Sequence, residues 1–373
     1  MIHTIGIAFN LKKKGIKDDA FEEYDEIETI QALRKELEAL GFEVILFEQD
    51  KNFLKNILKR KPDFIFNIAE GIGNTRARES QVPCLLESLD IPYSGSDPLS
   101  LGITLDKYLT NIILKSANIP VPLMFLVKDD KDLVSLKYIF ENEAPRVKAR
   151  SFSQTLHVER NPDHASIQPD VTSGLVLSRR DKKRFIVKPR WEGSSKGIFL
   201  NSVVKNFKEL KERVACVISK YKQPALVEEF LEKDEITVGV CGNKNPYLLG
   251  MMRIRLRDES QKIFLYSQEV KREWQSKIKY EPQKKIPPAI RRKIKKYALM
   301  AFSILELRDV ARIDFRLDKN NIPKIIDINP LPGLSPFYSD LPILCRLQGR
   351  GYRDLVKAIL KEALNRYGLI FPH

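Results

Sequence analysis

Cysteine and histidine are scarce in this chain of 373 residues, which has four of each. The cysteines form no Cys-x-x-Cys pair, and the histidines are as widely scattered. Neither a disulfide framework nor a zinc site is therefore indicated. We expect a reducing, cytoplasmic setting.

Long apolar runs are also missing. The opening MIHTIGIAFN lacks the basic start and the long apolar core of a signal peptide. No run reaches the roughly 20 apolar residues that a membrane-spanning helix needs. The sequence therefore predicts a soluble protein without a membrane partner.

Acidic residues are in deficit, since 64 Lys and Arg face 49 Asp and Glu, for a net charge of +15. This charge favours anionic partners such as nucleotides, acidic substrates or nucleic acid. The basic runs are not interleaved with aromatic residues as a base-stacking surface would be, so nucleic-acid binding rests on net charge alone and is not expected. The length predicts two or three domains.

The first hundred residues alternate between strand and helix patterns. Strands are predicted at 2–9, 43–47 and 63–69, and helices at 22–40 and 52–60. This βαβαβ pattern is typical of a parallel, Rossmann-like sheet, which binds ligands at the carboxyl ends of its strands. Glu70 and the loop 71–79 are therefore candidates for the rim of a site. On this pattern alone, a helix cap by Glu70 or its ion pair with Arg76 or Arg78 is favoured instead.

The middle of the chain is less regular. Residues 146–184 show no sustained period and predict an insertion, a lid or a loop. A short strand at 184–189 follows, then a Gly- and Ser-rich turn at 191–197 and a strand at 198–201. Such a turn exposes backbone N–H groups and hydroxyls that can cradle phosphates, although many hairpins are built from the same residues.

The last part of the chain mixes the two kinds of element. The predicted elements are helices at 205–221, 288–305 and 353–367, strands at 225–231, 235–241, 247–255 and 263–269, and a polar loop at 271–285.

Residues 310–335, VARIDFRLDKNNIPKIIDINPLPGLS, form the most informative stretch. Alternation and a two-residue turn at Asn320-Asn321 predict a β-hairpin. Its register pairs Asp314 with Asp327, and Arg312 with Asn329.

Two carboxylates that face each other across a hairpin repel unless a cation lies between them. The all-oxygen set of Asp314, Asp327 and Asn329 suits Mg²⁺. Ion pairs with Arg312 and Arg316 on a solvated sheet face explain the pattern equally well.

Seven segments, in this order along nearly the whole chain, resemble the D-alanine-D-alanine ligase branch of the ATP-grasp superfamily. They are FNIAEG (66–71), IPYSGSD (91–97), LDK (105–107), VKPRWEGSSKG (187–197), EEFL (228–231), ARIDFRLD (311–318) and IIDINPLPGLS (325–335). The resemblance raises the magnesium interpretation above the ion-pair one.

This resemblance implies an α/β chain, α+β in its C-terminal half, with the ATP-grasp fold. It implies a Rossmann-like preATP-grasp domain at 1–106, a central small domain at 107–234 with the insertion at about 146–184, and a C-terminal domain at 235–373. It also implies an ATP-dependent carboxylate-amine ligase that forms an amide bond through an acyl phosphate, as in cell wall biogenesis. The implied cofactors are ATP and two Mg²⁺ ions, with Mn²⁺ as a substitute. The implied partners are amino acids or peptides, and a homodimer is compatible with the family.

The family's residue roles transfer to matching positions. The implied nucleotide-binding residues are Lys107, Lys188, Glu192, Ser195, Glu228, Phe230, Leu231, Glu235, Lys271 and Ile326. The implied metal ligands are Asp314, Asp327 and Asn329. The implied catalytic groups are Arg312, the backbone N–H of Gly333, and Ser194 in the loop over the phosphates.

Four departures from the family all fall at the amino-acid end. The Glu of its Gly-Gly-x-Ser-x-Glu-Arg loop is missing after the first strand, and Lys271-Arg272 stands where the family has Lys-Tyr. Tyr338-Ser339 replaces Ser-Leu, and the insertion is long. We therefore expect altered amino-acid specificity, with Tyr338 and Ser339 near the substrate. The candidates to replace the missing carboxylate are Glu26, Glu28, Glu70 and Glu79.

Two other functions stay open. One is an ATP-grasp ligase that acts on a non-peptide carboxylate. The other is a nucleotide-binding regulator without catalysis. The intact Arg312 beside Asp314 and Asp327 argues against the second.

Overall fold

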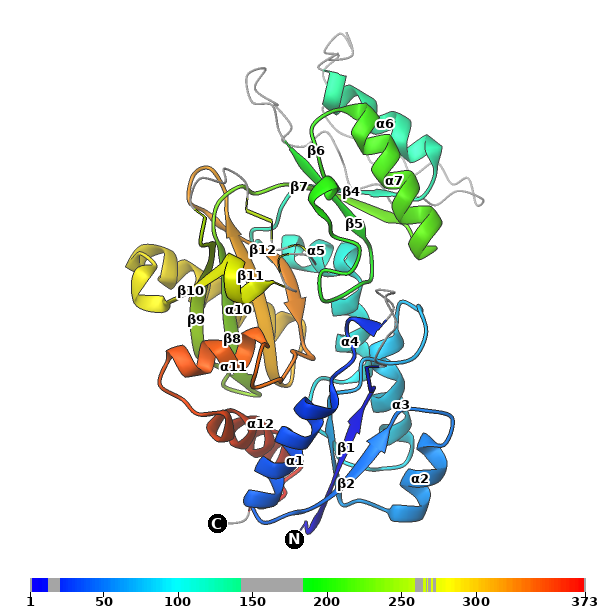
Figure 1. Cartoon of the computed structure of the whole chain (residues 1–373), viewed down its shortest axis with the longest axis vertical. Coiled ribbons are helices and arrows are strands. Elements are labelled where there is room, and N and C mark those ends of the chain that lie inside the picture. Colours follow the sequence, from blue (N-terminus) through cyan, green and yellow to red (C-terminus); the bar gives the residue numbers. More distant parts are fainter. Residues whose placement is uncertain are drawn as a thin grey trace, which may run out of the picture.

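The computed structural model describes residues 2–12, 21–141, 184–258, 264–265, 267, 270 and 273–371. Three β-sheets form its framework, and both chain ends lie near the first of them (Figure 1). The expected insertion and most of the strand expected at 263–269 lie outside the described residues. Within the described ranges, no helix combines the length and apolar character needed to cross a membrane.

The first sheet has the order β2-β1-β3 and is parallel, which confirms the predicted βαβαβ pattern. Its strands are β1 (Thr4–Phe9), β2 (Glu43–Glu48) and β3 (Phe64–Asn67), joined by α1 (Ile27–Ala39) and α2 (Phe53–Arg60). Next come η2 (Arg78–Ser80), α3 (Gln81–Ser88), α4 (Pro98–Leu105) and α5 (Lys107–Ser116). Helix α1 begins five residues later than predicted, because Asp25 forms a bridge to Leu11 and keeps this segment beside the sheet.

The second sheet is antiparallel, in the order β4-β7-β5-β6. Its elements are β4 (Met124–Val127), α6 (Asp130–Glu141), β5 (Phe185–Pro189), η3 (Leu200–Ser202), β6 (Val203–Val204), α7 (Phe207–Tyr221) and β7 (Ala225–Glu229). Helices α6 and α7 pack on this sheet (Figure 1). The strand predicted at 198–201 is wrong: the chain turns there, with Ile198 N donating to Ser195 O, and pairs with β5 only from Val203.

The third sheet is antiparallel, in the order β10-β9-β8-β11-β12. Its strands are β8 (Glu235–Gly242), β9 (Tyr247–Leu256), β10 (Ile278–Pro282), β11 (Asp309–Leu317) and β12 (Pro323–Asn329). Helix α10 (Pro288–Ile304) covers one face, while α11 (Asp340–Leu347) and α12 (Tyr352–Arg366) pack on the other and against the first sheet.

The polar loop predicted at 271–285 is partly wrong. This segment holds α9 (Trp274–Lys277), β10 and η4 (Gln283–Lys285). Ile278 is buried and pairs with β9, and the Trp274 ring contacts Tyr280. These two apolar contacts hold a mostly polar segment against the third sheet.

The predicted hairpin register is confirmed, since Asp314 faces Asp327 and Arg312 faces Asn329. Near the turn, however, the pairing differs from the prediction by one residue, because Leu317 lies opposite Pro323. A β-bulge at Ile326 then brings Asp314 and Asp327 back into the predicted register.

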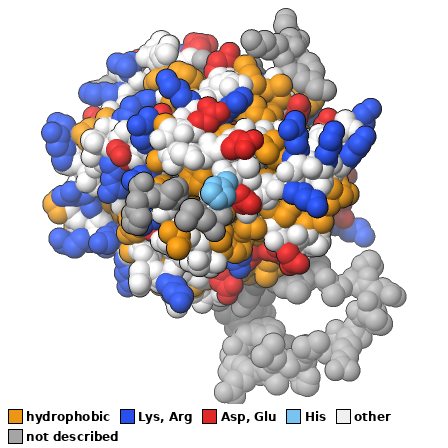
Figure 2. All heavy atoms as spheres, turned by 90° about the horizontal axis from the view of Figure 1, so that it is seen from below, with side chains coloured by type: hydrophobic (Ala, Val, Ile, Leu, Met, Phe, Trp, Pro, Cys, Tyr) orange, Lys and Arg blue, Asp and Glu red, His pale blue; other side chains and the backbone are white. Residues whose placement is uncertain are grey.

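The excess of basic residues is dispersed on the face shown in Figure 2. Lys and Arg side chains lie around its edge with Asp and Glu among them. On this face the net charge does not form one continuous basic patch.

A buried ion pair joins Arg366 of α12 to Asp309 of β11, and a backbone hydrogen bond ties the same carboxylate to the first unit, by which we mean the first sheet with α1 to α4. The fully buried carboxylate of Asp309 accepts hydrogen bonds from Arg366 Nη2 (3.0 Å) and from the backbone N of Gly95 (2.7 Å). Arg366→Met leaves this charge without its guanidinium, so we expect the free energy of unfolding to fall by about 3 kcal/mol in urea titrations. The control Arg34→Met, in an exposed pair on α1, is expected to cost less than about 1 kcal/mol. Equal stability of the two variants would contradict the assignment.

Candidate active site

Two cavities adjoin, and the first holds the predicted nucleotide-binding residues. It lies between the second and third sheets, because β5, β7, β11 and β12 all contribute to its wall. The predicted nucleotide residues that line it are Lys107, Lys188, Glu192, Ser195, Glu228, Phe230, Leu231, Glu235 and Ile326. Lys271 lies outside the described residues.

Each lysine of the first cavity is paired with a carboxylate. Lys188 Nζ lies 3.0 Å from Glu228 Oε2, and Lys107 Nζ donates to Asp327 Oδ1 at 2.6 Å. Burial alone would lower the pKa of Lys107, but the Asp327 charge raises it above its usual value. Burial raises the pKa of Glu228, against the opposing charge of Lys188. Lys107 therefore stays charged in a largely buried site.

Arg316 organises the far end of the first cavity and was missed as a site residue. Its guanidinium bonds Glu235 Oε2 at 3.1 Å, donates to the carbonyl oxygen of Leu231 at 2.8 Å, and lies over the rings of Phe230 and Phe264. Its pairing with Glu235, and not with the hairpin carboxylates, contradicts half of the ion-pair interpretation. An arginine between apolar strand residues was the available signal.

The predicted metal ligands share one face of the β11–β12 hairpin. Burial raises the pKa of Asp314, and the Asp327 charge adds to this while Arg312 opposes it. Burial alone would raise the pKa of Asp327, but the charges of Lys107 and Lys188 lower it.

This donor set fits a hard cation. In the described part of the chain, no group of three or more His, Cys, Asp or Glu could hold a metal ion. The predicted set of Asp314, Asp327 and Asn329 is not a group of that kind, because it has only two carboxylates and its third oxygen comes from an amide. Asn329 Oδ1 accepts from the backbone N of Leu331 at 2.9 Å, which fixes its orientation. Two opposed carboxylates with an amide oxygen are ligands that Mg²⁺ accepts.

Arg312 lines both cavities, as do Ser194 and Asp340. Its Nη2 lies 3.1 Å from Asp314 Oδ2, so the ion pair with Arg312 is present, but both side chains are largely buried and do not lie on the solvated face that the ion-pair interpretation expected. Ser194 has a left-handed backbone, with φ of 47°. For a residue other than glycine this conformation is uncommon, and it is frequent at sites that clamp ligands.

The second cavity has a volume of about 380 Å³ and an acidic wall. The predicted substrate residues Glu70, Tyr338 and Ser339 line it together with Gly333. The acidic residues along its wall are Glu22, Glu23, Asp25, Glu26, Glu70 and Asp340.

Of the four predicted replacement carboxylates, Glu26 and Glu70 line the second cavity. Within the described residues, Glu79 is buried and Glu28 is exposed on α1, and neither contributes to the cavity wall. Glu23 was missed, although the acidic run Glu22 to Glu26 before α1 was a visible signal.

Burial perturbs the acidic groups around this cavity. It raises the pKa of Asp25 to about 7, with the Glu26 charge adding to the effect. It also raises the pKa of Glu70 well above the usual value, with contributions from Glu79 and Glu23. The pKa of Glu79 rises to about 8, mainly through burial. A positively charged group in the cavity would favour the ionised carboxylates.

The arrangement of three sheets occurs in a solved structure. The crystal structure of D-alanine–D-alanine ligase from Bacillus anthracis complexed with ATP has a TM-score of 0.66 to this chain, over 99% of both chains and at 20% identity. At this identity the likeness shows the fold, which is the ATP-grasp fold. The chain thus shares its fold with this D-alanine–D-alanine ligase.

Sequence comparisons narrow the class. Residues 180–361 match the family model described as D-ala D-ala ligase C-terminus. The D-alanine–D-alanine ligase of Carboxydothermus hydrogenoformans is 29% identical over 346 residues, which cover 91% of this chain and 93% of the relative. Uncharacterized protein y4sG of Sinorhizobium fredii is 28% identical over 347 residues, 89% of this chain and 86% of the relative. Together these comparisons support a D-alanine–D-alanine ligase-like ATP-grasp protein and indicate an ATP-dependent ligase that forms a carbon–nitrogen bond.

Proposed function

We propose that the protein uses ATP to activate the carboxylate of one amino acid as an acyl phosphate and joins it to the amine of a second amino acid or peptide. The observation that carries this proposal is the wall shared by the two cavities. Arg312 and Ser194 line both, so a phosphoryl group from the first cavity and a carboxylate in the second can meet there. Reacting groups held within about 3.5 Å of each other react far faster than in free solution.

The first cavity is assigned to ATP. We assign Lys107 and Lys188 to the α- and β-phosphates, and the turn with Glu192 and Ser195 to their cover. Lys271, outside the described residues, is assigned to the γ-phosphate on the resemblance alone. Adenine lies against Glu228, Phe230, Leu231 and Ile326, and the ribose hydroxyls bond Glu235. The ion pair of Lys107 with Asp327 supports this assignment, because it brings the positively charged ammonium group of Lys107 next to the predicted metal ligands.

We propose domain boundaries near residues 106 and 234. Each of the three resulting parts contains one of the three sheets.

Asp314, Asp327 and Asn329 would hold two Mg²⁺ ions, or Mn²⁺ as a substitute. When bound, these ions neutralise the phosphate charge that would otherwise repel a carboxylate. Thr237 Oγ1 donates to Asp314 Oδ1 at 2.9 Å and fixes this carboxylate.

Arg312 and the backbone N–H of Gly333 are assigned to the oxyanion that forms when the amine attacks the acyl phosphate. Each such donor is worth about 3 to 4 kcal/mol in the transition state. A larger residue at position 333 would crowd Ser339, since a Cβ there would lie 2.8 Å from Ser339 Oγ.

The acidic wall of the second cavity supports a substrate that carries an ammonium group. Asp25, Glu26 and Glu70 are placed to bind it, in the role of the missing family Glu. Tyr338 and Ser339 line the same cavity, and we assign them to the second substrate; their difference from the family's Ser-Leu supports an altered specificity.

Amino-acid binding is expected to depend on pH through Asp25. With a pKa of about 7, its ionised fraction rises from about a tenth at pH 6 to about nine tenths at pH 8. Since the ionised form attracts an ammonium group, KM for the amino acid should fall about five- to tenfold over this interval. Steady-state kinetics of Asp25→Asn should show a high KM without this pH dependence. An unchanged profile in the variant would exclude Asp25 as the titrating group.

Trapping with hydroxylamine tests the proposed intermediate. An acyl phosphate reacts with hydroxylamine to give a hydroxamate, so each candidate amino acid is incubated with Mg-ATP and hydroxylamine and the hydroxamate is measured by mass. We expect ATP-dependent hydroxamate formation with one amino acid alone. Amide formation without any trappable intermediate under matched conditions would contradict the acyl-phosphate route.

A further inference from the structure

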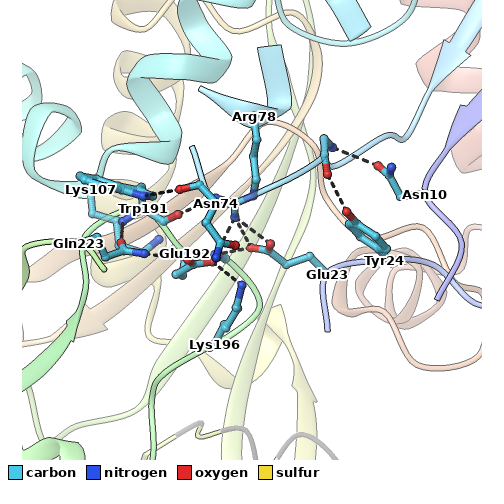
Figure 3. A network of polar contacts seen from close by, with 12 residues as sticks. Asn10, Glu23, Tyr24, Asn74, Arg78, Lys107, Trp191, Glu192, Lys196 and Gln223 are labelled. Carbon is cyan, nitrogen blue, oxygen red and sulfur yellow. Dashed lines mark hydrogen bonds and ion pairs between the residues drawn. The ribbon is translucent and has the colours of Figure 1, made fainter. Parts of the chain in front are cut away.

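A network of polar contacts joins the first unit to the turn at 191–197 (Figure 3). Its centre is Arg78 of η2, which is 2% exposed. Arg78 Nη2 donates to both oxygens of Glu23 at 2.7 Å, and Nη1 donates to the carbonyl oxygen of Trp191 at 2.8 Å. Nη2 also lies 3.4 Å from Glu192 Oε2. Burial alone would lower the pKa of Arg78, but the charges of Glu23 and Glu192 raise it.

The two carboxylates on Arg78 belong to different cavities. Glu23 lines the amino-acid cavity, and Glu192 lines the nucleotide cavity. Their side chains are only 4% and 1% exposed. A buried charge that loses its partner is strongly unfavourable, so this guanidinium fixes both carboxylates relative to each other.

Glu23 also holds the backbone of the turn. Its Oε1 accepts a hydrogen bond from Gly193 N at 2.5 Å, and a Cβ at Gly193 would lie 2.6 Å from this oxygen. The turn therefore packs on Glu23 with no room for a larger residue at 193.

The opposite side of the turn is held by contacts within the second unit, by which we mean the second sheet with its helices and connecting segments. Gln223 accepts from Trp191 N at 2.8 Å and donates to Glu192 Oε1 at 2.7 Å, and Lys196 Nζ lies 3.0 Å from Glu192. Ser194 and Ser195, at the tip, have φ of 47° and 60°. Such backbone conformations persist only where surrounding contacts enforce them, and Arg78 with Glu23 supplies those from the first unit.

We propose that Arg78 and Glu23 are positioning residues that hold residues 191–195 of the 191–197 turn over the nucleotide. Through this one ion-pair network, the first unit fixes the position of the nucleotide site and of one wall of the amino-acid cavity. The proposal rests on the assignment of ATP to the first cavity. Arg78 itself is not assigned a contact with the reacting atoms. The proposal therefore predicts an effect on ATP binding.

Steady-state kinetics test the effect on ATP. Arg78→Met should raise KM for ATP about tenfold or more and lower kcat less, because the turn is misplaced but the reacting groups remain. Arg78→Lys keeps the charge but cannot make the same set of hydrogen bonds, so it should restore only part of the affinity. The matched control Arg34→Met should leave KM for ATP unchanged. A loss of kcat alone in Arg78→Met would overturn the proposal.

A double-mutant cycle tests the contact itself. Gly193→Ala and Glu23→Ala should each raise the dissociation constant for ATP, the first because its Cβ displaces Glu23. The double variant should bind ATP no more weakly than whichever single variant has the higher dissociation constant for ATP, since both substitutions remove the same contact. Gly102→Ala is the control, because a Cβ there meets Ser80 Oγ at an ordinary 3.5 Å. Additive losses would show that the two residues act independently and would contradict the proposal.

A fluorescence readout separates this proposal from the proposed activity. In Trp274→Phe, Trp191 is the remaining tryptophan, because the chain has two. Adding Arg78→Met should make Trp191 fluorescence at least about twice as sensitive to acrylamide without ATP or amino acids, as expected for a turn released from its contacts. Thermal unfolding checks that the variant is folded. Unchanged quenching in a folded variant would overturn the positioning role, whereas absent turnover with increased quenching would reject only the proposed activity.

Discussion

Replacing Arg312 with methionine is expected to lower kcat by about 100- to 1000-fold, the usual loss for one oxyanion donor. Arg312 lines both cavities and lies 3.1 Å from Asp314, which places it where acyl transfer would occur. The end of the first cavity that we assign to adenine and ribose is lined by other residues, so the dissociation constant for ATP should change less than about threefold. Rapid-quench kinetics and equilibrium ATP binding measure the two quantities.

The Arg312→Met experiment needs saturating Mg²⁺, because Arg312 also contacts a predicted metal ligand. Arg34→Met again serves as the control, since its guanidinium pairs with Glu38 on the exposed side of α1. A variant that keeps its kcat but binds ATP weakly would assign Arg312 to the nucleotide instead of the reacting carboxyl group.

Asp327→Asn is expected to lower kcat/KM for Mg-ATP by about 1000-fold or more, because Asp327 serves two charged groups at once. It accepts from Lys107 at 2.6 Å and faces Asp314 across the hairpin. Asparagine preserves its volume but removes the negative charge that attracts Mg²⁺. Activity should recover only in part when the Mg²⁺ concentration is raised.

Titration of ADP release against Mg²⁺ measures this effect. The control Glu38→Gln removes a carboxylate from the exposed face of α1 and should leave the titration unchanged. If Asp327→Asn has the native Mg²⁺ requirement, the metal ligands lie elsewhere and the hairpin carboxylates serve only their ion pairs.

Local patterns explain why the hairpin could be predicted. The alternation around Asp314 and Asp327 is a property of neighbouring residues and predicted which side chains share a face, while the position of the turn predicted the two cross-strand pairs that the structure shows. The bulge at Ile326 depends on how β12 packs, so the sequence did not reveal it. A one-residue error at the turn and the bulge compensate each other.

Contacts between distant segments explain what the sequence did not reveal. Arg78 is 55 residues from Glu23 and 113 residues from Trp191, so no local pattern connects them. Glu235 and Arg316 are likewise 81 residues apart. Their pairing follows from the alignment of β8 beside β11, which is a property of the whole sheet. The resemblance to a family predicted residues that line one cavity, whereas the acidic wall of the other cavity depends on how the segment before α1 folds.

The errors in secondary structure have the same origin. Residues 198–201 have strand-like composition, but the left-handed Ser194 and Ser195 direct the chain into a turn before β6. Tertiary burial of Ile278 likewise made a strand from a polar stretch.

ADP release with simultaneous mass analysis of the product tests the central claim most directly. Mg-ATP is combined with single amino acids and pairs, including D-Ala, D-Ser, D-Lac, L-amino acids and short peptides. The proposed function predicts ADP release that depends on a particular amino acid or pair, with a product whose mass equals the two substrates less one water. ATP binding without substrate-dependent ADP release or amide product across the panel would contradict it.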